Sequence, residues 1–242
     1  MVGMDACRDA DELRTALWVI RDEERATGAK AYLKSDLEFY GVAAKPLRTV
    51  AHAFLDEHRE MDRDQLVELI LELWSVPIFE MKAVAVALLE RRVGRFEIGD
   101  LSLVEDLLRR SHTWALVDWL CTKVAAPLIE RETDVAEPVL LRWSIDPDFW
   151  IRRASMLSLL PALRAGGGDF ELFASFASRM VSEKEFFIRK AIGWVLRDVS
   201  KKRPQLAYDF LDLHLNEVSG LTFREGSKYL PSEMRDELRS RR

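Results

Sequence analysis

The sequence has few of the residues that build metal centres and disulfide frameworks. Its 242 residues include only two cysteines, Cys7 and Cys121, and four histidines without ligand spacing. Two cysteines cannot complete a four-cysteine zinc or iron–sulfur site, and disulfides are rare in a reducing cytoplasm. We therefore expect neither a metal nor a cofactor.

Long hydrophobic runs are also missing. The densest apolar run, residues 83–89, is too short to cross a bilayer. Residues 1–5 include an acid where a signal peptide carries bases, which indicates no export. We expect a monomer without membrane contact that works in the cytoplasm, associated with the nucleoid.

An excess of positive charge, the usual sign of a nucleic-acid-binding protein, is absent overall. The chain has 36 basic and 41 acidic residues, a net charge of −5. The halves differ, because residues 1–121 hold 16 basic and 23 acidic residues, and residues 122–242 hold 20 and 18. A polyanionic partner is therefore compatible with this sequence only if basic groups gather on one face.

Helical periodicity dominates what is present. Apolar residues recur at steps of three and four, for example over residues 66–74 and 187–199, with no persuasive β alternation. Glycines and prolines separate these segments. Asp146 with Pro147 resembles a helix start, and Ser111 and Ser182 are weaker starts. The sequence predicts an all-α fold of about a dozen helices with short turns.

The helices repeat. The pattern of residues 78–85 recurs at 149–156 and 186–193, and four matched positions are 36, 35 and 37 residues apart: Lys82, Asp118, Arg153 and Lys190. Such a period is typical of an α-solenoid with a concave groove. We expect one domain over residues 1–242, with an N-terminal helical cap (1–60), repeats (61–203) and a C-terminal cap (204–242).

Three of the four matched positions are basic and one is acidic. If all four line the concave face, that face offers a row of cations around one carboxylate. Cations suit phosphates, and a carboxylate suits a cationic group between them.

Two aromatic positions accompany these charges. Trp114 lies four residues before Asp118, on one helix face. Trp194 lies within a basic stripe made with Lys190, Arg197 and Lys201 at steps of 4, 3 and 4. Spacing alone leaves alternatives open, because Asp118 could pair with Arg153 and the stripe could be a solvated face. We expect Trp18, Trp74 and Trp143 in the core, and Trp119 and Trp150 in packing roles.

This inventory suits one kind of chemistry. A purine alkylated on a ring nitrogen is already a cationic leaving group, and breaking its glycosidic bond leaves positive charge on the sugar. A carboxylate stabilises that charge, indole faces attract cations, and Arg and Lys hold phosphates. No arrangement typical of a nucleophilic triad is apparent.

Three segments carry a family resemblance: residues 113–118 (TWALVD), 150–154 (WIRRA) and 187–197 (FIRKAIGWVLR). They resemble the AlkD-type alkylpurine DNA glycosylases, and the likeness spans residues 15–230. The resemblance implies HEAT-like repeats and a monofunctional enzyme of base excision repair. Such an enzyme removes 3-methyladenine- or 7-methylguanine-type bases from duplex DNA, without flipping them into a protein pocket.

The resemblance also implies roles for single residues. Asp118 is similar to the catalytic carboxylate, Trp114 and Trp194 to the aromatics around the lesion, and Tyr32 to a further cleft aromatic. Arg153 is similar to a phosphate-binding arginine, and Arg48, Arg197 and Lys201 to backbone contacts. The chain departs from the family at Thr113, Ala115, Ala44 and Pro161.

Two other functions fit the same sequence. A relative on this scaffold could bind DNA without excising a base. A helical-repeat protein could instead bind peptides or other proteins.

Overall fold

The computed structural model describes residues 5–242, which are organised as helices and connecting turns. Within this range the β-type pairing is one isolated bridge between Glu38 and Ile78. The all-α prediction is confirmed. The expectation about export concerns residues 1–5, of which residues 1–4 lie outside the described range. No helix in the described range is long and apolar enough to span a membrane.

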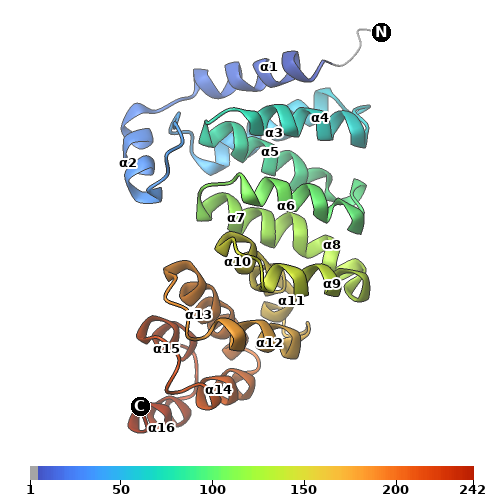
Figure 1. The fold of residues 1–242 in the computed structure, drawn as a ribbon. Helices are drawn as coiled ribbons and strands as arrows, with labels where there is room; N and C mark the ends of the chain where they lie inside the picture. The colour runs from blue at the N-terminus through green and yellow to red at the C-terminus, as the bar shows by residue number, and fades with distance from the viewer. Residues whose placement is uncertain (1–4) are drawn as a thin grey trace. The chain divides into compact units, whose positions relative to one another are not determined.

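The chain forms two compact units, Met1–Val124 and Ala125–Arg242. The first unit, blue to green in Figure 1, contains seven α-helices and two short 3-10 helices among its described residues. Their bounds are α1 (Ala6–Val19), α2 (Glu23–Leu33), α3 (Ala44–Glu57), α4 (Arg63–Ser75), α5 (Phe79–Arg92), η1 (Val93–Arg95), η2 (Ile98–Asp100), α6 (Leu101–Arg109) and α7 (Trp114–Leu120). A π-helical turn, η3 (Cys121–Ala125), follows α7.

Helix α5 is the core of the first unit. Ten consecutive residues, from Glu80 to Leu89, are buried, because α3, α4 and α7 pack around this helix. In Figure 1, α3 and α4 run alongside α5. Helix α4 begins sharply because Asp62 and Gln65 form a capping box.

The second unit contains nine described helices, yellow-green to red in Figure 1. They are α8 (Ala126–Arg131), α9 (Thr133–Ser144), α10 (Phe149–Leu157), α11 (Leu160–Arg164), α12 (Phe170–Met180), α13 (Phe186–Ser200), α14 (Pro204–Leu213), α15 (Gly220–Gly226) and α16 (Ser232–Ser240). Helix α13 is central and packs against α10, α11, α14 and α15. Gly193 permits the close approach of α15, since a Cβ there would lie 2.8 Å from the Cβ of Glu225.

The four matched positions of the repeat fall on four helices. Lys82 lies on α5, Asp118 on α7, Arg153 on α10 and Lys190 on α13. The expected row of exposed cations is wrong for two of them, because Lys82 is 5% exposed and Arg153 2% exposed. Both side chains turn inward to backbone carbonyls: Lys82 Nζ donates to Trp74 O at 2.6 Å, and Arg153 Nη1 donates to Phe187 O at 2.5 Å.

The tryptophans divide between core and surface. Trp74 and Trp143 are fully buried, as predicted. Trp18 is 49% exposed, so its expected core position is wrong. Its ring meets Tyr40 edge-on at 5.2 Å, and the Arg21 guanidinium lies 4.1 Å above it. These two contacts replace burial as the source of its packing.

Candidate functional site

Helix α7 presents Trp114 and Asp118 on one face of the first unit. Thr113 caps the helix, its side chain accepting from the Ala115 amide at 3.5 Å, and both functional side chains are half-buried. Tyr32 from α2 is 72% exposed and meets the Trp114 ring edge-on at 5.7 Å. The structure therefore brings together two of the aromatic residues that the sequence singled out, one helical turn from Asp118.

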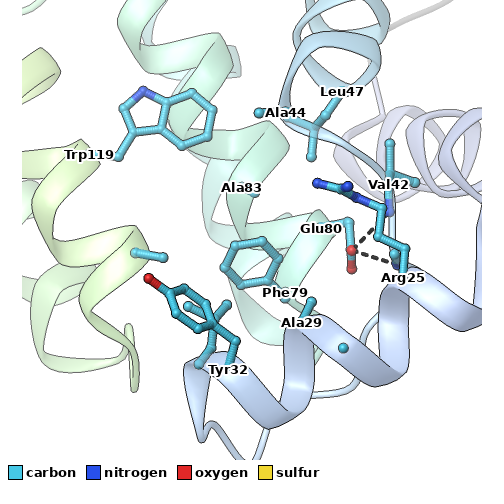
Figure 2. Close-up of a pocket in the computed structure, with 14 residues that line it drawn as sticks. Arg25, Ala29, Tyr32, Val42, Ala44, Leu47, Phe79, Glu80, Ala83 and Trp119 are labelled. Atoms are coloured by element: carbon cyan, nitrogen blue, oxygen red, sulfur yellow. Dashed lines mark hydrogen bonds between the residues drawn. The ribbon is translucent and has the colours of Figure 1, made fainter.

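A pocket of about 560 Å³ opens beside this face (Figure 2). In the figure, the Tyr32 and Trp119 rings border one side and Arg25 and Val42 the other. Its walls come from α2, α3, α5, α7 and the segment before α3, and the lining residues are Arg25, Gly28, Ala29, Tyr32, Leu33, Gly41, Val42, Ala44, Leu47, Phe79, Glu80, Ala83, Ala115 and Trp119. No motif in the sequence indicated this pocket, because its walls are far apart along the chain.

Trp119, which we expected in a packing role, is half-buried. It lines the pocket, and its Nε1 donates to Glu90 Oε2 at 2.8 Å. The Arg48 guanidinium lies 4.4 Å above the indole centroid and donates to the same Glu90 oxygen at 3.3 Å. Arg48, which we expected to contact DNA, is therefore half-buried and already engaged by a carboxylate and an aromatic ring.

Glu80 holds the segment that forms one wall of the pocket. Its buried carboxylate accepts from the backbone amides of Tyr40, Gly41 and Val42 at 2.8, 2.8 and 3.2 Å. Burial raises the pKa of Glu80, and these amide hydrogen bonds partly oppose the rise. Gly41 has a φ of 79°, and a Cβ there would lie 2.0 Å from Asp22 O, so only glycine fits.

In the second unit, Trp194 is half-buried on α13. Its Nε1 donates to Asp198 Oδ2 at 3.2 Å. The same carboxylate receives Arg164 Nε at 2.8 Å and Lys201 Nζ at 2.6 Å. Burial alone would raise the pKa of Asp198, but the hydrogen bonds and charges of Lys201 and Arg164 outweigh it, so the pKa lies below its ordinary value.

The other basic residues predicted in this unit differ in their burial and in whether they have an acidic partner. Arg197 forms an ion pair with Glu225 at 2.5 Å, whereas Lys190 is exposed with its Nζ 5.9 Å from the Phe186 ring centroid. Arg153 is buried beneath the first turn of α13. Of the three basic residues in the predicted stripe, Arg197 and Lys201 have acidic partners.

One set of hydrogen-bonded polar groups links α12 to the end of α14. No motif in the sequence indicated this set. Ser178 Oγ lies 2.8 Å from His214 Nε2, and His214 Nδ1 lies 3.0 Å from Glu217 Oε1. The order matches a nucleophile, a base and an acid. However, Ser178 lies inside helix α12, where neighbouring amides bond within the helix and cannot stabilise an oxyanion. We interpret these three residues as a hydrogen-bonded link between α12 and the end of α14.

No group of three His, Cys, Asp or Glu side chains within residues 5–242 is arranged to hold a metal ion.

Comparison with known families shows which family the chain belongs to. The family model described as "DNA alkylation repair enzyme" matches residues 13–230, close to the span of the predicted resemblance. The chain belongs to the DNA alkylation repair enzyme family. No curated relative matches the sequence.

Three solved structures resemble this family member. A predicted DNA alkylation repair enzyme from Enterococcus faecalis is 26% identical, covers 88% of this chain and 97% of its own, and has a TM-score of 0.79. AlkD2 from Streptococcus mutans is 15% identical over 94% of this chain and 100% of its own, with a TM-score of 0.64. The protein smu.31 from Streptococcus mutans UA159 is 18% identical over 77% and 92%, with a TM-score of 0.58. The two Streptococcus structures support the fold alone, which is the all-α, AlkD-type stack of helical repeats.

Proposed function

We propose that this family member is a monofunctional DNA glycosylase. It excises cationic N3- or N7-alkylated purines from duplex DNA, as 3-methyladenine or 7-methylguanine, and leaves an abasic site for base excision repair. It does so without flipping the base into a pocket, and it acts as a monomer on nucleoid DNA in the cytoplasm.

One observation carries the proposal beyond family membership. Trp114 and Asp118 share a half-buried face of α7, and Tyr32 packs edge-on against the Trp114 ring. An electron-rich aromatic wall attracts a cationic nucleoside, and a carboxylate one turn away stabilises positive charge on the sugar as the glycosidic bond breaks. Asp118 can also orient the attacking water.

The remaining roles are assigned residue by residue. We propose that Trp194 contacts the lesion nucleotide, and that Lys190 binds backbone phosphates. Arg48, Arg197 and Lys201 also bind phosphates, after exchanging the acidic partners they have in the free protein. For Arg153 we propose support of the first turn of α13 through the Phe187 carbonyl, because its buried guanidinium faces that backbone rather than solvent.

The test is release of base from a duplex that contains 7-methylguanine, measured in single turnover. We expect Asp118→Asn to lose on the order of 10²-fold or more in rate, the scale for one preorganised electrostatic group. Asp106→Asn is the matched control, because Asp106 is an exposed carboxylate on α6 paired with Arg110. It should keep the full rate.

Other outcomes separate the alternatives. Equal rates for wild type and Asp118→Asn would exclude the catalytic role. Salt-sensitive binding of DNA without base release would identify a non-catalytic DNA-binding relative. Absence of DNA binding at low salt would favour a protein-interaction scaffold.

A further inference from the structure

We propose that Asp198 is a positioning residue that fixes the Trp194 indole and restrains the cations around it. The inference rests on the proposed function. One buried carboxylate then affects both the affinity of the protein for DNA of any sequence and the rate at which it excises a damaged base.

The two carboxylate oxygens of Asp198 have different partners. Oδ2 accepts from Trp194 Nε1 at 3.2 Å and from Arg164 Nε at 2.8 Å. Oδ1 accepts from Lys201 Nζ at 2.6 Å, with Arg197 Nε at 4.0 Å. Asp198 is 3% exposed, so a single buried anion faces three basic side chains and one indole.

The indole depends on this acceptor. An indole N–H can only donate a hydrogen bond. Among side chains, an ionised carboxylate is the strongest acceptor for it, because the negative charge strengthens the bond. Trp194 is only half-buried, so packing alone leaves its ring less constrained than a core tryptophan. Misplacing a contact group by about 1 Å can cost on the order of 10²-fold in rate, so anchoring this ring has kinetic value.

A similar arrangement of a carboxylate, an indole and a cation occurs in the first unit. There Glu90 accepts from Trp119 Nε1 and from Arg48, and Arg48 lies over the indole. In the second unit Arg164 lies 5.9 Å from the Trp194 ring centroid and shares the carboxylate with it. In both cases a carboxylate holds an indole edge and a cation near its face, which is an arrangement that fixes a ring.

The second role of Asp198 concerns charge. Lys201 and Arg164 are half exposed, yet the carboxylate neutralises much of their charge. Removing that negative charge frees both cations for phosphates. DNA of any sequence should then bind more tightly, while excision falls if the indole is released. A merely structural residue would weaken both.

Two variants separate the roles. Asp198→Asn keeps an oxygen acceptor for Trp194 and removes the charge, whereas Asp198→Leu removes both. Glu225→Gln is the matched control, because it frees the Arg197 cation on α13 and does not contact the Trp194 N–H in this structure. Melting temperatures establish that each variant is folded, and the near-isosteric asparagine keeps the test usable if the leucine variant does not fold.

Three measurements follow. The Kd for undamaged duplex is measured by anisotropy at several salt concentrations. The excision rate is measured at saturating duplex that contains 7-methylguanine. The Trp194 indole resonance is followed in ¹H–¹⁵N spectra and assigned by its loss in Trp194→Phe.

For both Asp198 variants we expect Kd to tighten about 3- to 10-fold, and the salt slope to steepen by about one to two phosphate contacts. Asp198→Leu should also lose about 10- to 100-fold in excision rate and shift the indole resonance upfield. Asp198→Asn should stay within a few-fold of the wild-type rate. Glu225→Gln should tighten binding without moving the indole signal.

Two results would overturn the inference. An unchanged indole resonance and rate in Asp198→Leu would exclude positioning, and unchanged or weaker DNA binding in Asp198→Asn would exclude restraint of the cations. If the wild-type protein releases no base, the glycosylase proposal fails, but the binding and resonance measurements still decide the role of Asp198.

Discussion

Lys82 carries its ammonium group into the interior of the first unit. Burial, and then the charge of Arg110, lower the pKa of this amine to about 8. The Trp74 carbonyl at 2.6 Å and the Trp74 ring, 4.9 Å from Nζ, are the contacts that make a buried cation tolerable. The unfolded chain has the ordinary amine pKa near 10.5.

This shift predicts a pH-dependent stability. Below about pH 8 the amine is charged in both states, so the folded protein bears the full cost of the buried charge. Between about pH 8 and 10.5 the folded state releases the proton and the unfolded state keeps it, so the cost disappears as pH rises. Relative to Lys82→Met, the wild-type free energy of unfolding should rise by roughly 2 kcal/mol from pH 7 to pH 10.

Urea denaturation at a series of pH values measures this difference. Lys45→Met, at an exposed position on α3, is the control and should show a flat difference. A difference between wild type and Lys82→Met that did not change with pH would contradict the depressed pKa.

Lys82 and Arg153 also show which properties of a single residue the sequence predicts and which it does not. Their place in the repeat was predicted, and both lie on the helices that the repeat indicated. Their burial was not, because a long basic side chain can lie along a helix face or turn inward to a carbonyl. The choice depends on acceptors from other segments, Trp74 O and Phe187 O.

At the scale of elements, Glu80 ties α5 to the segment that precedes α3. Three backbone amides donate to one buried carboxylate, and this fixes a wall of the pocket beside Tyr32. A loop held by so few groups should open locally when they are removed.

Glu80→Gln tests this tie. The amide keeps one acceptor oxygen, so at least one of the three backbone donors loses its partner, at a cost of about 1–3 kcal/mol. Hydrogen exchange should accelerate at the amides of Tyr40, Gly41 and Val42 and change little in α13. Glu38→Gln, at an exposed position in the same segment, should leave exchange as in wild type. Unchanged protection in Glu80→Gln would show that other contacts hold the loop.

Helices were easier to predict than their ends or the pocket. The apolar period of residues 187–199 matches α13 (Phe186–Ser200) closely. Helix α10 begins at Phe149 rather than at Pro147, because Asp148 caps it and Asp146 instead accepts from the Asp148 amide. Likewise Thr113 and Glu185 cap α7 and α13, rather than Ser111 and Ser182. The pocket could not be predicted, since it depends on contacts between residues 25–47 and 115–119.

For the whole molecule, the net charge of −5 limits how strongly it can bind a polyanion. The cations proposed to meet phosphates are Arg48, Lys190, Arg197 and Lys201, and only Lys190 among these four has no acidic partner within the described residues. The other three must exchange a carboxylate for a phosphate, which reduces the gain from each contact.

The salt dependence of DNA binding should therefore be shallow. Each phosphate neutralised contributes about −0.9 to the slope of log K against log salt, so four contacts give a slope no steeper than about −4. Lys190→Ala should reduce that slope by about one. Arg109→Ala, which removes an ion pair with Glu105 inside α6, should leave it unchanged. A slope much steeper than about −4, measured by anisotropy with an undamaged duplex, would mean that further cations meet the DNA and that these four do not define the binding surface.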